Sequence, residues 1–226
     1  MGSIGVGFAG SMTSFSTFMA NCFEALANVV PYYSRSSGYN VMALLGQIVI
    51  TISASLGGIS LGASIYLSCE RYMRPIGSAP VFEVIVASSL ALASLIACSV
   101  LAGTASGFVW KSVALTGVFA PFGTLLRYFL SRRLNGRFAS FPLGTFTANI
   151  TGTVIISVSL LLTFYPFASI SIIDCAVLRA VANGFCGCLT TVSTLALELS
   201  TLKLRHAWRY GSASIICGLC VTILIL

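Results

Sequence analysis

The chain has 226 residues, of which 57% are hydrophobic and only 8% are charged, and its formal net charge is +7. A soluble globular domain cannot hide that much apolar surface, so the composition excludes that class and indicates an integral membrane protein. The positive charges lie in short loops beside apolar runs. This placement favours membrane topology over nucleic-acid binding as their explanation.

Seven apolar segments are long enough to cross a hydrocarbon core of about 30 Å as α-helices. In chain order they cover residues 4–28, 41–67, 81–103, 108–130, 143–165, 174–200 and 208–226. The connections between them are short, and no soluble domain is attached. We therefore expect an all-α membrane protein with about seven transmembrane helices.

The basic residues are divided unevenly between the two sides of the membrane. The loops after the second, fourth and sixth segments contain Arg71, Arg74, Arg132, Arg133, Arg137, Lys203, Arg205 and Arg209. The opposite side has only Arg35, Lys111 and Arg179. Because cytoplasmic loops carry the excess of Lys and Arg, this bias predicts a cytoplasmic N-terminus and an extracellular C-terminus.

A glycine- and hydroxyl-rich motif in the first segment returns in the sixth. Residues 7–18 read GFAGSMTSFSTF and residues 184–195 read GFCGCLTTVSTL, with six of twelve positions identical. In the predicted topology the two copies point in opposite directions, and segment 81–103 is the odd span that makes this inversion possible. Inverted repeats are a common transporter plan, with the binding site at the interface between the repeats.

The motif itself has two interpretations. Glycine, serine and threonine allow membrane helices to approach closely, so it can be a tight helix crossing. Alternatively, two glycines within four residues weaken an α-helix. Carbonyls freed at membrane depth must then be satisfied by protein, water or an ion. Two such breaks crossing near the midplane would aim carbonyls at one point, where a cation such as Na⁺ could sit.

Four motifs together resemble the fluoride channels of the CrcB/Fluc family, whose eukaryotic members are called FEX fluoride exporters. GFCGCLTTVST, residues 184–194, resembles the third-helix motif of that family. GTLLRY, residues 123–128, is similar to the first-helix motif, and PLGTFTAN, residues 142–149, to the second. Tyr210, Ser214 and Gly218 resemble the fourth-helix pattern.

The resemblance implies three parts. Residues 108–226 form a complete four-helix unit, residues 81–103 a linking helix, and residues 1–67 the last two helices of a second unit. Eukaryotic members fuse two units through one extra helix, giving nine spans. The chain therefore looks like the fused form without its first two spans, and we expect a truncated gene model rather than a natural reduced form. We expect a monomer if the chain is full-length, and self-association with a second copy if the two helices are absent.

The same resemblance assigns the fluoride pore. Its donors would be the amide of Asn149 and a hydroxyl track, while interfacial phenylalanines would contact the anion through their ring edges. The implied pore residues are Asn149, Phe15, Phe18, Thr145, Ser212, Ser214 and Tyr210. Asn149 could instead make a plain interhelical hydrogen bond. The counterparts of Phe15 and Phe18 in the second copy, Val192 and Leu195, have no ring edge, so we expect one working pore and one vestigial pore.

Further expectations concern ions and charged groups. A central structural Na⁺, the one expected cofactor, is implied on backbone carbonyls of Gly10, Thr13, Gly187 and Thr190. Arg127, embedded in a helix, could snorkel to the interface or line an anion vestibule. Glu198 matches an acidic position of the family motif, whereas the first copy has Asn21 there.

The expected function is a passive, fluoride-selective channel of the plasma membrane that lowers fluoride toxicity. A membrane potential that is negative inside would drive the anion out. The implied partners are the fluoride ion and the lipid bilayer, without nucleic acid. No GxxxxGK[ST] motif or catalytic cluster occurs in the sequence, so we do not expect an enzyme.

Two alternatives remain open. A proton-coupled small-cation exporter usually needs a carboxylate deep in a helix. All five acidic residues fall near predicted helix ends, which counts against it. A non-conducting remnant is the other alternative, and the missing helices favour it.

Overall fold

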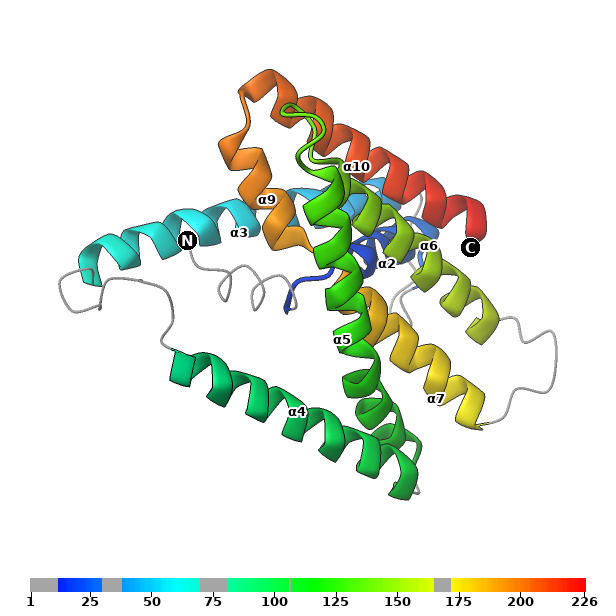
Figure 1. The fold of residues 1–226 in the computed structure, drawn as a ribbon. Helices are drawn as coiled ribbons and strands as arrows, with labels where there is room; N and C mark the ends of the chain where they lie inside the picture. The colour runs from blue at the N-terminus through cyan, green and yellow to red at the C-terminus, as the bar shows by residue number, and fades with distance from the viewer. Residues whose placement is uncertain (1–11, 30–37, 70–80, 106, 165–171) are drawn as a thin grey trace.

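The computed structural model describes residues 12–29, 38–69, 81–105, 107–164 and 172–226 (Figure 1). Within these ranges every regular element is helical, which confirms the all-α membrane class. The first three elements are α2 (Phe15–Ala27), α3 (Tyr39–Cys69) and α4 (Val81–Thr104). α2 ends where Asn28 takes a left-handed conformation with φ 57°, which asparagine tolerates better than most side chains.

The remaining elements form the larger part of the bundle. They are α5 (Phe108–Leu134), α6 (Leu143–Phe164), α7 (Ile172–Ala180), η1 (Val181–Cys186), α8 (Gly187–Leu189), α9 (Val192–Thr201) and α10 (Leu204–Ile225). η1 is a π-helical turn, a form often found at functional sites. It continues α7 directly into α8, and α9 follows after two extended residues, so the predicted segment 174–200 corresponds to the single candidate span Ile173–Thr201.

Six spans in the described part of the chain are long and apolar enough to cross a membrane. They cover Tyr39–Ser68, Ile85–Thr104, Phe108–Leu134, Leu143–Phe164, Ile173–Thr201 and Leu204–Ile225. These correspond to six of the seven predicted segments. The predicted segment 4–28 is described only from Met12, and its helix α2 has 13 residues. A seventh span at this position therefore stays a prediction.

Both copies of the repeated motif are interrupted helices. Helical structure stops after Met12 and after Leu189, and it resumes at Phe15 and at Val192. The two residues between the helical parts are extended at the same place in each copy. The predicted breaks are thus present, although residues 7–11 of the first motif lie outside the described ranges.

The helices that follow the two interrupted segments run in broadly opposite directions. In Figure 1, α3 runs from right to left along the chain and α10 from left to right. α2 packs against α10, and α9 packs against α3, so each half-helix contacts the long helix of the other copy. This exchange is what an antiparallel pair of repeats predicts. The division into a partial unit, a linking helix and a complete unit stays a prediction.

Helix α4 packs against α5 near one end of the bundle and diverges from it toward the other end (Figure 1). The two helices are close at Gly117, where an added Cβ would lie 2.6 Å from Sγ of Cys98. Most of the burial is elsewhere. No residue in the most apolar windows of α3 and α4 is buried, compared with 61% in the window within Ile173–Thr201.

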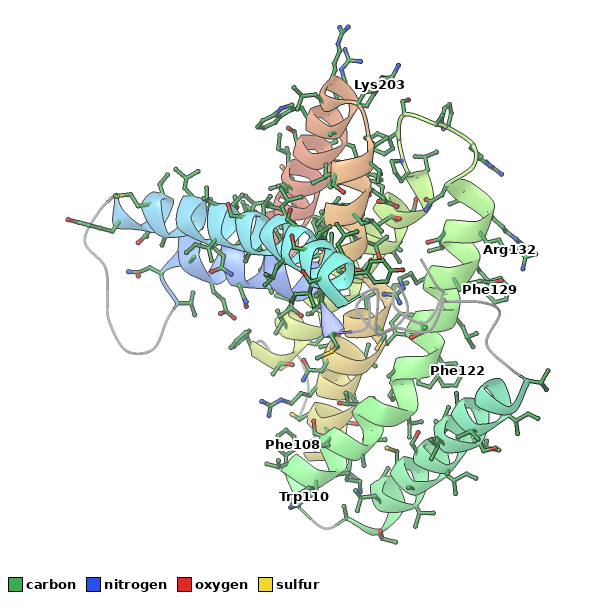
Figure 2. All side chains as sticks on the ribbon, turned by 90° about the vertical axis from the view of Figure 1, so that its left-hand side faces the viewer. Phe108, Trp110, Phe122, Phe129, Arg132 and Lys203 are labelled. Carbon is green, nitrogen blue, oxygen red and sulfur yellow. The ribbon has the colours of Figure 1, made fainter. Side chains whose placement is uncertain are left out.

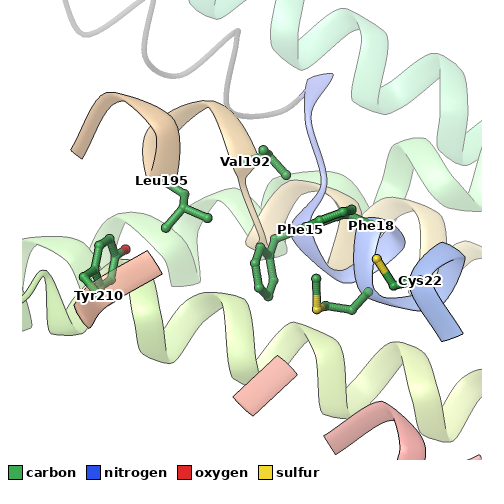
Figure 3. Packing of buried hydrophobic residues seen from close by; sticks show 7 residues of the cluster. Phe15, Phe18, Cys22, Val192, Leu195 and Tyr210 are labelled. Carbon is green, nitrogen blue, oxygen red and sulfur yellow. The ribbon is translucent and has the colours of Figure 1, made fainter. Parts of the chain in front are cut away.

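The main apolar core lies where the two interrupted segments meet (Figure 3). Its buried members are Phe15, Phe18, Met19, Cys22, Val192, Leu195 and Tyr210. The core thus joins residues from opposite ends of the chain. It places the motif phenylalanines and their two aliphatic counterparts in a single cluster.

The two ends of the bundle differ in chemistry. Arg132 and Lys203 lie at one end in Figure 2, whereas Phe108 and Trp110 lie at the other. Arg132 and Lys203 therefore lie on the side away from Phe108 and Trp110, and the predicted orientation in the membrane stays a prediction. Arg35, Arg71 and Arg74, which also entered that prediction, lie outside the described ranges.

Candidate ion path at a helix crossing

Reciprocal hydrogen bonds join the two helix breaks. The hydroxyl oxygen of Thr190 accepts a bond of 3.1 Å from the backbone N–H of Ser16. The hydroxyl oxygen of Thr13 accepts a bond of 3.1 Å from the backbone N–H of Ser193. Thr13 corresponds to Thr190 in the motif, and Ser16 to Ser193. The two copies therefore exchange the same contact, as a local two-fold axis between them requires.

Each half-helix beyond a break is capped in the same way. Ser14 accepts a bond from the N–H of Thr17 at 3.2 Å, and Thr191 accepts one from the N–H of Thr194 at 3.2 Å. Both capping residues are extended, and a hydroxyl at this position satisfies one of the orphan donors of a helix N-terminus. The matched hydroxyls of the repeat thus start a new helix at a fixed point, which the close-packing interpretation does not explain.

Asn149 on α6 holds the second break open. Its Oδ1 accepts the Thr191 N–H at 2.8 Å, and its Nδ2 donates to the Thr191 carbonyl at 3.2 Å. In an uninterrupted helix the Thr191 N–H would bond to the carbonyl of Gly187. Asn149 therefore takes the place of one helical hydrogen bond. Thr191 was not among the predicted site residues, although a hydroxyl at the same place in both copies was an available signal.

The motif phenylalanines are inside the protein. Phe15 is fully buried and Phe18 is 4% exposed, and their rings meet edge to face at 6.0 Å. The Phe15 ring lies against Gly218 of α10, where an added Cβ would be 3.0 Å from its Cε1. Helix α2, which carries both rings, packs on α6 and on α10, the two helices that carry the predicted polar residues.

The predicted hydroxyl track is only partly assembled. Tyr210 and Ser214 are fully buried on one face of α10, and Ser214 donates to the Tyr210 carbonyl at 2.8 Å. Ser212 is exposed, because two residues along a helix turn the side chain to a different face. The structure does not bring Ser212 together with the other predicted residues.

A carboxylate joins α6, α9 and α10 at the basic end of the bundle. Glu198 accepts a bond of 2.6 Å from Thr145 at Oε1 and one of 2.7 Å from Tyr210 at Oε2. Asn135 also donates to Thr145 and accepts the Thr145 backbone N–H at 3.0 Å. Asn135 was missed because the Asn-Gly pair indicates a turn, which hid its role at a polar cluster.

Arg127 lies on α5 and is 9% exposed, so its side chain is enclosed by the protein. Gly123 lies one turn earlier on α5. A Cβ added to Gly123 would meet the backbone carbonyl of Phe185 in η1. Enclosure favours a role inside the protein over snorkelling to the interface.

The donor set fits the expected central Na⁺ in part. Asn149 accepts the Thr191 N–H, which in an uninterrupted helix would donate to the Gly187 carbonyl. Thr13 and Thr190 lie at the two breaks. Carbonyl oxygens released from a helix are suitable ligands for a hard cation. Gly10 lies outside the described ranges, so the fit rests on the other three residues.

Sequence comparison decides the family. Residues 114–226, half of the chain, match the family model described as CrcB-like protein, Camphor Resistance (CrcB). The chain belongs to the CrcB-like family. The matched residues contain Asn149, the second break and the polar face of α10.

Named relatives of the CrcB-like chain extend the similarity to its N-terminal part. It is 36% identical to Fluoride export protein 1 of Neurospora crassa over 99% of the chain and 46% of the relative. It is 34% identical to Fluoride export protein 1 of Candida albicans over 97% of the chain and 59% of the relative. The bacterial Fluoride-specific ion channel FluC of Chromobacterium violaceum is 40% identical over 42% of the chain and 71% of the relative.

The chain thus spans about half the length of the first two relatives. No solved structure matches the chain.

Proposed function

We propose that this CrcB-like protein is a passive fluoride-selective channel that lets fluoride leave the cytoplasm. The printed names of its relatives support fluoride as the ion. The observation that carries the proposal is the burial of Phe15 and Phe18 on α2, which packs on α6 and α10, the helices of Asn149 and Ser214. Two segments from opposite ends of the chain thereby enclose one line of donors.

The proposed path begins at Glu198, Thr145 and Tyr210 and continues past Asn149 and Ser214 to the Phe15 ring. Fluoride is small and strongly hydrated, so its dehydration must be offset by donors inside the protein. Hydroxyl and amide hydrogens can replace water, and the positive edge of an aromatic ring contacts an anion without a strong bond. The exposed Ser212 has no part in this path.

The two sides of the crossing are unequal. One proposed pore uses Asn149 and Ser214 with Phe15 and Phe18. The related position on the other side meets Val192 and Leu195, which have no ring edge, so we propose one working pore and one vestigial pore.

A Na⁺ ion is proposed at the crossing, on the carbonyls of Gly10, Thr13, Gly187 and Thr190. Such an ion would supply a fixed positive charge that ties the two breaks together. Thr190 and Thr13 join the two breaks by hydrogen bonds. Asn149 accepts the Thr191 N–H and so leaves the Gly187 carbonyl without its helical hydrogen bond from that group.

The proposed orientation has a cytoplasmic N-terminus and an extracellular C-terminus in the plasma membrane. The position of Arg132 and Lys203 on the side away from Phe108 and Trp110 supports it (Figure 2). Arg127 would then lie near the cytoplasmic entrance, where its charge attracts anions. The negative interior potential would drive fluoride outward at about 2.3 kcal/mol per charge for each 100 mV.

An open polar groove favours a second candidate, a chain that does not conduct alone. The groove lies between α2 and α3, and its polar lining is Thr13, Ser14, Thr17, Asn21, Gln47, Thr51 and Ser55. On the related face of the other copy, α6 covers the break with Asn149. A chain with one face covered and the other open could need further helices, or a second copy, for activity.

Ion release from liposomes tests the proposal. The purified chain is reconstituted into vesicles loaded with potassium fluoride or potassium chloride, and release is followed after a potassium ionophore is added. We expect ionophore-dependent release of fluoride and none of chloride. Equal release of both ions would contradict a selective channel. No release from well-dispersed, folded protein would favour the second candidate, and its oligomeric state would then be measured.

A further inference from the structure

A second pair of hydroxyls lies beyond Phe15, in line with the proposed donors. On α6, the fully or almost fully buried polar side chains Thr145, Asn149, Thr153 and Ser157 follow each other at four-residue spacing. On α10, the buried positions Tyr210, Ser214, Gly218 and Thr222 follow the same spacing. Residues four apart on a helix lie on one face, so each helix carries one buried, mostly polar stripe.

The two stripes are in register. α6 and α10 pack together and run in the same sense, both starting from the basic end of the bundle (Figure 1). Thr145 and Tyr210 bond to the two oxygens of the same carboxylate, which fixes them at one level. Ser157 lies twelve residues after Thr145, and Thr222 lies twelve residues after Tyr210. Both are therefore about 18 Å farther along, at a rise of about 1.5 Å per residue.

The Phe15 ring falls between the two ends of these stripes. It contacts Gly218, one turn before Thr222, and the absence of a side chain there gives the ring its place. Asn149 and Ser214 lie on one side of this level, and Ser157 and Thr222 lie on the other. An anion that passes the ring toward the far end would next need donors at this second position.

Ser157 differs from the other hydroxyls on its helix. Thr153, Ser159 and Thr163 each donate to the carbonyl four residues earlier, at 2.7 to 2.8 Å. Ser157 is fully buried, and its hydroxyl has no hydrogen-bond partner among the residues that the structure describes. A buried hydroxyl without a partner destabilises the fold, because the group has lost its water without gaining another hydrogen bond. Its position in the stripe indicates that the missing partner is a ligand of the path.

The face of α6 that packs against the second interrupted segment is not the face that carries Ser157. Gly152 lies against the Thr190 side chain, and Ile156 packs with Cys186 of η1. Ser157 is the next residue after Ile156, so it lies about 100° around the helix from that contact, in line with Asn149 and Thr153.

We propose that Ser157 and Thr222 form a second anion-binding position beyond Phe15, with the Ser157 hydroxyl as its principal hydrogen-bond donor. The ligand is the permeating fluoride, so this inference rests on the proposed function. No covalent step is involved: the O–H group donates to the anion in place of one water molecule and returns to water when the anion leaves.

Ser157→Ala is the direct test, and Ser159→Ala is its matched control. Both serines are buried on α6, but the Ser159 hydroxyl already donates to Ile155. In the fluoride-release assay we expect Ser157→Ala to slow release about tenfold, the size of a lost hydrogen bond to a charged group. Ser159→Ala should stay within about twofold of the unchanged chain, and Thr222→Val should give a smaller reduction than Ser157→Ala.

Thermal unfolding in detergent separates a binding role from a structural one. Because the Ser157 hydroxyl has no hydrogen-bond partner in the described part of the chain, Ser157→Ala should keep or raise the melting temperature while it slows release. A fall in both quantities would assign Ser157 to packing and overturn the inference. Ser157→Thr, which keeps a hydroxyl, should retain more release than Ser157→Ala.

The outcomes also separate this inference from the proposed function. If the unchanged chain releases fluoride and Ser157→Ala matches Ser159→Ala, the second position does not exist and the channel proposal stands. If the unchanged, folded chain releases no fluoride, both proposals fail.

Discussion

The two interrupted segments share a backbone design but differ in what covers them. At Thr191, an amide from α6 bonds to both the N–H and the carbonyl of the capping residue. At the related Ser14, the neighbouring side chains line an open groove between α2 and α3. The break is therefore encoded in the repeated motif itself, whereas the covering of the break at Thr191 depends on Asn149 from α6.

The same comparison explains the unequal side chains. Phe15 and Phe18 belong to the segment with the open groove, yet the Phe15 ring lies against Gly218 of α10. The early segment thus supplies aromatic edges to a path whose polar residues come from the late unit. Val192 and Leu195 occupy the related positions within the same core.

The largest expected effect is at the phenylalanines. Phe15→Leu or Phe18→Leu removes a ring edge while it keeps a large apolar side chain, so we expect fluoride release to be abolished. Placing phenylalanine at positions 192 and 195 should change fluoride release little if that side is vestigial. Because both positions are buried, we use the smaller change Val192→Leu as the control and expect near-normal release. Equal sensitivity of Phe15 and Val192 would refute the unequal pores.

A large effect on stability is expected at Asn149. Asn149→Ala leaves the N–H and the carbonyl of Thr191 without their bonds, at about 1–3 kcal/mol for each buried group. Thermal unfolding in detergent should show a clearly lower melting temperature. Gln47→Ala, which changes an amide lining the open groove, should have little effect on unfolding. If the two changes lowered the melting temperature equally, the difference between the covered break at Thr191 and the open break at Ser14 would be contradicted.

A smaller, balanced effect is expected at the reciprocal bonds. Thr13→Val and Thr190→Val each remove one hydroxyl that accepts a backbone N–H of the other copy. Each change should lower the free energy of unfolding by about 1–3 kcal/mol. Denaturant or thermal unfolding measures this loss for both variants. If the loss in the free energy of unfolding at one site were more than about three times the loss at the other, the result would count against the local two-fold relation.

The sequence predicts the membrane class, six of the spans and the position of both breaks, because hydropathy and the repeated motif are local signals. It also points to Asn149 through its motif. The length of α2 and the separation of Ser212 from Ser214 depend on helix ends and helix rotation, which hydropathy does not define. The partners of Glu198 come from α6, α10 and the turn after α5, so Asn135 could not be found from its neighbours in sequence.

Burial also changes how some of the predicted residues act. Asn149 was expected either as a pore donor or as an interhelical hydrogen-bond partner, and its amide does bond to both the N–H and the carbonyl of Thr191. Thr145 and Tyr210 were expected as anion donors, but both bond to Glu198. Such pairings form only when helices distant in sequence pack together, so a sequence motif identifies the residue but not its partner.

Disulfide cross-linking at the crossing tests the central claim most directly. In a chain without native cysteines, Thr13→Cys with Ser193→Cys, and separately Ser16→Cys with Thr190→Cys, place thiols where the hydroxyl oxygens lie 3.0 and 3.1 Å apart. We predict efficient cross-linking of both pairs within one chain in the membrane, and none for Ser16→Cys with Ser212→Cys. If neither reciprocal pair cross-links, or if the bonds form only between two chains, the early and late segments do not meet as described and the account is contradicted.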